Sequence, residues 1–112
     1  MLNHTPTRLT VDVQGSTVFA HGEIDALTSH QLKTALEPLL EVGDIGLDLA
    51  DIGFMDSSGL RVIVDAHVKA LDAGFRFELV NPGSRVRRLI NVSGLDGAIR
   101  IAERDHSTNG LG

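Results

Sequence analysis

Two adjacent serine hydroxyls follow an acidic residue in the segment Asp56-Ser57-Ser58-Gly59. A serine hydroxyl can accept a phosphoryl group, and it can act as a nucleophile when a base activates it. Asp or Ser at the start of a helix can accept hydrogen bonds from the first free amides, and a glycine there lets a docked molecule approach the backbone. The same amides favour an anion by about 0.3–1 kcal/mol when they are exposed. The segment therefore indicates either a simple helix cap or a place where a phosphate on Ser58 would be tolerated.

Competing chemistries fit this segment less well. A serine hydrolase needs a Gly-x-Ser-x-Gly turn and a histidine oriented by an acid, but Met55 stands where the first glycine should be, and His67 falls on the predicted buried face of a helix. The other histidines are scattered, so no metal site is expected. A phosphorylated Asp56, as in a response-regulator receiver, would need a lysine after a late strand, whereas Lys33 and Lys69 lie on predicted helices. We expect a binding protein without a cofactor rather than an enzyme.

The elements that position these serines follow from hydrophobic periodicity and turn residues. The predicted elements are strands over 9–13 and 17–21, a helix from 28 toward 43, a strand over 45–55, a helix over 56–73, a strand over 75–79, a helix over 84–92 and a short strand over 99–101. The first two strands form a hairpin around the turn Gln14-Gly15-Ser16, and Gly74 and Gly94 are placed to end the last two helices. The order is two strands followed by three alternations of helix and strand.

Several local features of the helices are predicted as well. Thr28 and Gln31 have the spacing of a capping box, and Pro38 predicts a kink or an early end of the first helix. Ser84 is expected to cap the third helix. The predicted buried face of the second helix contains Leu60, Ile63, Val64, His67 and Leu71.

Strand–helix–strand units imply parallel crossovers. The sequence therefore predicts an α/β fold, with a mixed four- to five-stranded sheet and helices packed against it. Because helices begin where parallel strands end, we expect Asp25, residues 56–59 and residues 81–85 to share one edge of the sheet. Open α/β sheets carry their functional sites at this edge.

Composition narrows the class of partner. The chain has 112 residues, a net charge of −5 and no cysteine, tryptophan or tyrosine, which disfavours nucleic acid and anionic membranes as main partners and excludes disulfides. No apolar run resembles a signal peptide or a membrane span, so we expect a cytoplasmic protein without membrane insertion. We predict one domain over residues 8–104, with flexible ends at 1–7 and 105–112.

Two motifs resemble those of a known family. The stretch Leu47 to Leu60, with the sequence LDLADIGFMDSSGL, closely resembles the core motif of STAS domains, in particular bacterial anti-sigma factor antagonists. Gly22-Glu23-Ile24-Asp25 resembles the second family signature, which precedes the first helix. The predicted order of elements is also similar, so the resemblance covers approximately Leu9 to Ala102 and identifies the fold as a STAS-type single domain.

The resemblance implies a partner-switching cycle. The unphosphorylated antagonist binds an anti-sigma factor, itself a GHKL-type serine kinase, and frees a sigma factor. The kinase phosphorylates the second serine of the pair, here Ser58, and a metal-dependent serine phosphatase restores the hydroxyl. The acidic residue at the position of Asp25 belongs to the partner-binding surface in the family. The predicted partner-binding residues are Asp25, Asp56, Ser57, Ser58, Gly59, Asn81 and Ser84.

Other interpretations of these residues stay open. Asp25 could be a plain acid at a helix start, Ser57 a first-turn helix residue or a competing phosphate acceptor, and Asn81 and Ser84 simple turn and cap residues. STAS domains also serve as regulatory subunits of membrane transporters, including lipid ABC systems, without serine phosphorylation. The paired serines and the short stand-alone format favour the antagonist.

Overall fold

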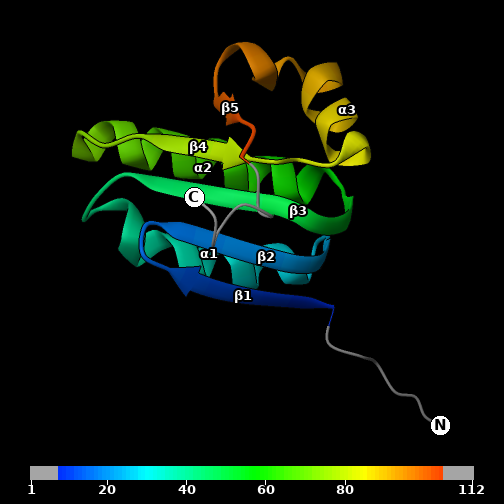
Figure 1. The fold of residues 1–112 in the computed structure, drawn as a ribbon, viewed down its shortest axis with the longest axis horizontal. Helices are drawn as coiled ribbons and strands as arrows, with labels where there is room; N and C mark the ends of the chain where they lie inside the picture. The colour runs from blue at the N-terminus through cyan, green and yellow to red at the C-terminus, as the bar shows by residue number, and fades with distance from the viewer. Residues whose placement is uncertain (1–7, 105–112) are drawn as a thin grey trace, which may run out of the picture.

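A computed structural model describes residues 8–104 of the chain. It contains one five-stranded sheet and three α-helices (Figure 1). The elements are β1 (Leu9–Gln14), β2 (Thr17–Ile24), α1 (Thr28–Leu40), β3 (Ile45–Met55), α2 (Ser57–Ala73), β4 (Phe77–Val80), α3 (Ser84–Ser93), a short 3-10 helix η1 (Leu95–Gly97) and β5 (Arg100–Ala102). The predicted α/β fold and order of elements are confirmed. The segments predicted to be flexible, 1–7 and 105–112, lie outside the described residues.

The sheet is mixed and keeps its strands in chain order, β1-β2-β3-β4-β5. β1 and β2 pair antiparallel around Gly15, whose φ of +63° suits the tight turn. The other neighbouring strands pair in parallel. Figure 1 shows α1 and α2 side by side behind the sheet and α3 near its β5 side. The carboxyl ends of β2 and β3 therefore lie together, with Ile24 opposite Met55.

The core is almost entirely aliphatic, and Phe77 is the one buried aromatic residue among residues 8–104. Alternate residues of the central strands, among them Val18, Leu47 and Leu79, point toward the helices and are fully buried. Leucines at helical spacing in α1 complete this layer. The packed layer makes the helix starts a firm platform for the polar residues that follow each strand.

The start of α1 differs from the predicted capping box. The Oδ1 atom of Asp25 accepts hydrogen bonds from the amides of Leu27 and Thr28, both at 3.0 Å. The Gln31 side chain instead donates to the carbonyl of Leu9, at 3.0 Å. The capping-box prediction is therefore wrong, because an earlier carboxylate already satisfies the free amides. Pro38 predicted a kink or an early end of this helix; α1 includes the proline and ends two residues later, at Leu40.

The buried face of α2 is only partly as predicted. Ile63 is buried, but Leu71 is 59% exposed, and Leu60, Val64 and His67 are only half-buried. The residues that α2 buries are mostly small; they are Gly59, Val62, Ile63, Ala66 and Ala70. Small side chains let the helix lie close to the sheet and to α1, and a search for large apolar residues misses them.

The predictions for the remaining helix ends are confirmed in part. Gly74 and Gly94 end α2 and α3 in the left-handed conformation, with φ of 85° and 81°, which confirms both predictions. Ser84 does not cap α3: the N-cap is Gly83, and no side chain bonds the free amides there. Ser84 is the first residue of the helix itself and not the N-cap, so its hydroxyl is not positioned to bond the free amides.

Candidate functional site

Ser58 lies in the first turn of α2 and is half-buried. Its amide donates to Oδ1 of Asp56 at 2.8 Å, so Asp56 is the N-cap that the sequence predicts. The backbone carbonyl of Asp56 also accepts from the amide of Gly59 at 3.0 Å. Neighbouring Ser57 is exposed. The turn is thus fixed by the Asp56 carboxylate and by backbone hydrogen bonds, while within residues 8–104 the Ser58 hydroxyl takes no part in holding it.

Gly59 allows this turn to sit against the sheet. A Cβ atom at Gly59 would lie 2.5 Å from Cγ of Met55 and 2.9 Å from Cγ2 of Ile24. Both neighbours belong to the buried ends of β2 and β3. The glycine therefore brings Ser58 close to the carboxyl edge of the sheet through its lack of a side chain.

Asp25 follows β2 at the same edge and is held as an anion. Besides the two amides of the loop, its carboxylate accepts from the Thr28 hydroxyl at 3.1 Å and pairs with Arg8 at 3.1 Å. The pKa of Asp25 lies below its ordinary value mainly because its carboxylate accepts a hydrogen bond from the Thr28 amide. The Thr28 hydroxyl, the Leu27 amide and Arg8 lower the pKa further, whereas the loss of solvation on burial raises it. The Asp56 amide bonds the Ile24 carbonyl at 3.1 Å, so the residues after β2 and β3 are directly joined.

Ser58 faces a surface hollow of about 490 Å³ between α1 and α2. Ser57 and Ser58 line it at the start of α2. The remaining lining residues are Ala26, Ser29, His30, Lys33, Arg61, Val62 and Asp65. An enzyme or a docking protein can therefore reach this part of α2 from solvent.

Asn81 and Ser84 lie apart from this group. The last paired residue of β4, Val80, stands opposite Asp48, well before β3 ends at Met55. The Asn81 side chain bonds the backbone of Arg104 twice, at 2.8 Å and 2.6 Å, and so extends the contact between the ends of β4 and β5. Ser57 and Ser58 line the hollow, and Asp25, Asp56 and Gly59 adjoin them through hydrogen bonds and packing at the ends of β2 and β3; Asn81 and Ser84 do neither. The structure thus joins five of the predicted residues, Asp25 and 56–59, and separates two.

A second hollow, of about 390 Å³, lies between the end of β3 and α3. Phe54 and Met55 line it from β3, and Arg85, Arg88, Leu89 and Val92 line it from α3. Phe54 is 44% exposed and Val92 is 79% exposed. Leu27, in the loop after Asp25, is 75% exposed. Sequence reasoning did not identify these apolar side chains as exposed, because hydrophobic periodicity does not show which apolar residues a neighbouring element covers.

Comparison with known proteins decides the family. The family model described as "STAS domain" matches residues 8–107. The chain belongs to the STAS domain family.

Relatives of this STAS domain carry a consistent name. It is 36% identical over 84 residues to the anti-sigma-B factor antagonist of Bacillus subtilis, which covers 74% of this chain and 77% of the relative. It is 33% identical over 96 residues to the anti-sigma-B factor antagonist of Listeria monocytogenes, with 83% of each chain covered. Among solved structures, an anti-sigma factor antagonist from Mycobacterium paratuberculosis matches with a TM-score of 0.71 and 25% identity, over 84% of this chain and 83% of that one. Unphosphorylated SpoIIAA, 22% identical, shares the fold with a TM-score of 0.72, over 90% and 91% of the two chains.

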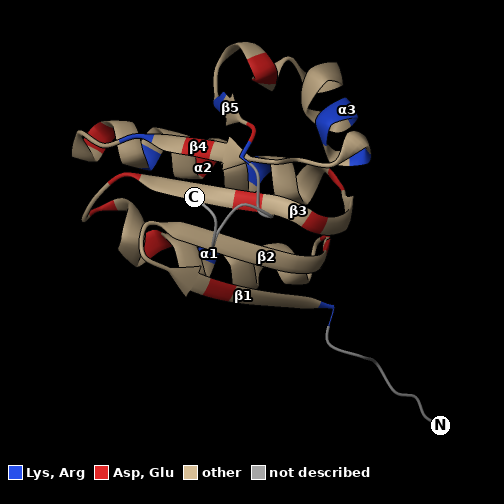
Figure 2. Ribbon diagram, viewed as in Figure 1, with Lys and Arg blue, Asp and Glu red and all other residues tan. Residues whose placement is uncertain are grey.

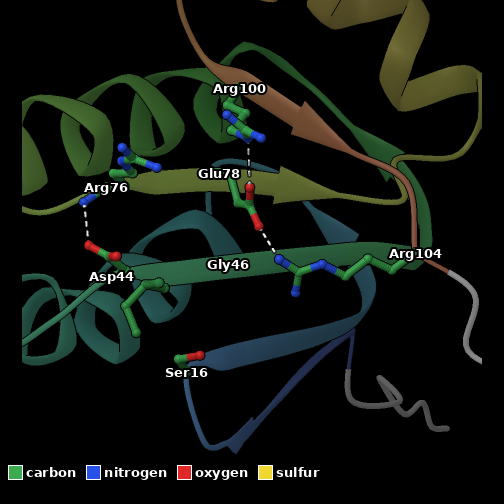
Figure 3. A pocket seen from close by; sticks show the side chains of 8 residues that line it. Ser16, Asp44, Gly46, Arg76, Glu78, Arg100 and Arg104 are labelled. Carbon is green, nitrogen blue, oxygen red and sulfur yellow. Dashed lines mark hydrogen bonds and ion pairs between the residues drawn. The ribbon is translucent and has the colours of Figure 1, made fainter. Parts of the chain in front are cut away.

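The opposite edge of the STAS domain carries a hollow of another kind (Figure 3). This space of about 230 Å³ lies where β3, β4 and β5 begin, and Arg76, Arg100 and Arg104 contribute to its lining. Glu78 pairs with both Arg100, at 3.3 Å, and Arg104. Glu78 thus already pairs with two of the three arginines, and the hollow shares no residue with the one beside Ser58, where the predicted serines lie; we therefore place the candidate site at the Ser58 edge.

Two further classes of site are not found in residues 8–104. No cluster of His, Cys, Asp and Glu there could hold a metal ion. In the same range, no helix combines the length and the apolar character that crossing a membrane requires. Figure 2 shows acidic and basic residues distributed over the ribbon, with basic residues gathered on α3.

Proposed function

We propose that this STAS domain is an anti-sigma factor antagonist that works by binding and is switched by phosphorylation of Ser58. The unphosphorylated form binds an anti-sigma factor that is a serine kinase, and so frees a sigma factor in the cytoplasm. The observation that carries this proposal is that Ser58 is half-buried at a rigid helix start and faces an open hollow. The carboxylates of Asp25 and Asp56 lie at the same edge of the sheet. The names of the relatives favour this function over that of a transporter subunit.

In the phosphoryl transfer to Ser58, the partner kinase supplies the catalytic groups. The kinase brings ATP and magnesium, and its general base takes the proton from the Ser58 hydroxyl while the oxygen attacks the γ-phosphorus. The bond from that phosphorus to the bridging oxygen breaks, and ADP leaves. Asp56 is the N-cap of α2 and is engaged with the Ser58 amide, so it serves as part of the platform and not as the base. A metal-dependent phosphatase removes the phosphate and completes the cycle.

A charge argument supports the switch. A phosphoserine adds about −1.5 to −2 charges at neutral pH. Ser58 lies in the turn capped by Asp56, and the Asp56 amide is bonded to the residue before Asp25. A third anion at this edge raises repulsion and the cost of desolvation at a tight interface. A penalty of about 3 kcal/mol weakens binding by roughly a hundredfold, which suffices to release a partner.

The surroundings of the serine support a docking role. Leu27 lies in the loop after β2, and Phe54 lies at the end of β3; both side chains are exposed. Fixed polar groups beside exposed apolar side chains are typical of the centre of a protein–protein interface. We propose that Asp25, Asp56, Ser57 and Gly59 contact the partner together with Ser58, and that Asn81 and Ser84 contribute at its margin.

Binding titrations with serine variants test the proposal. Each GHKL-type anti-sigma factor of the source organism is purified and titrated with the wild-type chain, Ser58→Ala and Ser58→Asp. We expect one kinase to bind the wild type and Ser58→Ala with similar affinity, and Ser58→Asp at least about 30-fold more weakly, equivalent to about 2 kcal/mol. The matched controls Ser57→Ala and Ser57→Asp should bind within a few-fold of the wild type. Equal affinities of Ser58→Ala and Ser58→Asp for the bound kinase would contradict the proposal.

A further inference from the structure

The hollow beside Ser58 is rich in basic side chains, although the chain as a whole has a net charge of −5. Arg61 comes from α2, and His30 and Lys33 come from α1. We propose that this hollow is a phosphate-binding subsite in which Arg61 pairs with the phosphate carried by Ser58, assisted by Lys33 and His30 from the facing helix. The proposal rests on the proposed function, because it assigns the place where the phosphate of the switch is held.

The spacing on α2 favours Arg61 as the main contact. Ser58 and Arg61 are three residues apart on one helix, and side chains at this spacing are neighbours with Cβ atoms about 5–6 Å apart. An arginine stem can span that distance, and its planar guanidinium can bond two phosphate oxygens at once. Both residues line the same hollow, so their side chains share one space.

The existing ion pairs leave Arg61 available. Among residues 8–104, Arg61 forms no ion pair or side-chain hydrogen bond with another residue. Lys33 contacts Glu37 at 4.0 Å, and Lys69 shares that carboxylate at 3.6 Å. Lys33 can therefore turn toward a phosphate while Glu37 keeps a partner. A new dianion in the hollow meets one free cation and one weakly held cation.

The acidic groups around the hollow oppose these cations. Asp65 lines the hollow on α2, Asp56 caps the helix, and Asp25 stands after β2. Asp25 is already paired with Arg8 and Asp56 with the Ser58 amide, so both carboxylates are partly compensated. His30 of α1 also lines the hollow. The balance of charge at the phosphate thus depends mainly on Arg61.

This arrangement has a consequence for the switch. The second ionisation of a phosphoserine has a pKa of about 6, so nearby carboxylates alone would leave part of the phosphate as a monoanion near neutral pH. Arg61 stabilises the dianion and lowers that pKa. The phosphate then carries its full charge throughout the ordinary pH range of a cell, and the release of the partner does not weaken when the pH falls slightly.

A phosphorus NMR titration tests the subsite without any partner protein. Phosphoserine is installed at position 58 during translation, and the 31P shift is followed from about pH 4.5 to 8 at low salt, where charges are least screened. Replacement of Arg61 by glutamine (Arg61→Gln) should raise the pKa of the phosphate by at least about 0.4 units, because it removes a positive charge about one helical turn away. Arg61→Lys should restore at least half of the difference.

A control separates this effect from general charge. Arg76→Gln removes one positive charge at the opposite edge of the sheet, beside the Glu78 hollow, and should leave the phosphate pKa within about 0.1 units of the wild type. If Arg61→Gln changes the phosphate pKa no more than Arg76→Gln does, the proposed subsite is refuted, even if a kinase phosphorylates Ser58. Conversely, failure of every kinase to modify Ser58 would refute the proposed function and leave the pKa comparison valid, because the phosphoserine is installed independently.

Discussion

Gly59→Ala tests the packing that brings Ser58 to the sheet edge. The new Cβ atom would lie 2.5 Å from Cγ and 3.1 Å from Sδ of Met55, and 2.9 Å from Cγ2 of Ile24. Met55 is flexible and can turn aside, but Ile24 is fully buried at the end of β2 and has little room. Overpacking of this kind costs about 1–3 kcal/mol. Alanine in place of glycine inside a helix gains about 1 kcal/mol. We therefore expect a net loss of about 0–2 kcal/mol in the free energy of unfolding.

Urea and thermal unfolding measure this loss. For a domain of this size, each kcal/mol corresponds to a fall of about 4–8 °C in Tm. Gly53→Ala is the matched control, since a Cβ there meets nothing within 4 Å, and its Tm should change little. The double variant Met55→Ala with Gly59→Ala should be more stable than the sum of the two single losses predicts, because truncation of Met55 makes room for the new methyl group. A Gly59→Ala variant that is more stable than the wild type would refute the reasoning, since helix propensity alone would then govern the site.

Two other predictions concern the groups around Ser58. The folded-state pKa of Asp25 is lowered, so its contribution to stability is fully present above its ordinary pKa of 3.8 and is lost as the pH falls through the lower folded value. Asp25→Asn should therefore be less stable than the wild type at pH 6, and the gap in Tm should narrow toward pH 3; a gap that stays constant or widens on acidification would contradict the assigned cause. Leu27→Ser and Phe54→Ala should each weaken binding of the anti-sigma factor by about tenfold while Tm stays within a few degrees, because these side chains are exposed at the proposed interface. Val42→Ser, which changes a residue as exposed as Leu27 just before the amino end of β3, is the control and should bind like the wild type; equal losses for all three would argue against a localised interface.

The sequence predicts the order of elements well because each strand carries alternating apolar residues and each junction carries a turn residue. Gly74 and Gly94 end their helices as expected, since the left-handed conformation is a local demand that glycine meets. The N-cap role of Asp56 is equally local. Features fixed by a few consecutive residues were thus accessible without the structure.

Features that depend on contacts between residues far apart in the sequence could not be predicted from the sequence. Asp25, and not the pair Thr28 and Gln31, bonds the start of α1, because the path of the loop after β2 decides which oxygen reaches the amides. The buried face of α2 consists mainly of small residues such as Ala66 and Ala70, whose burial depends on how closely the helix approaches its neighbours.

The relative lengths of the strands explain the two predicted site residues that lie apart. Topology alone places the ends of β2, β3 and β4 on one edge, and the register refines this. β3 continues well beyond the residue that pairs with Val80, so Asn81 follows a strand that stops earlier. Strand length and register are set by pairing with neighbours, which hydrophobic alternation does not reveal. Arg61 was missed for a related reason, since its closeness to His30 and Lys33 depends on the packing of α1 against α2.

The most direct test of the central claim is to follow the complex when ATP is added. The wild-type chain is bound to its anti-sigma factor kinase, magnesium and ATP are supplied, and the complex and the mass of each chain are recorded over time. We predict that one phosphoryl group appears on Ser58, mapped by fragmentation, and that the complex is lost at the same rate, while the complex formed by Ser58→Ala persists. A phosphate on Ser57 or Asp56, or a complex that survives full modification of Ser58, would contradict the account.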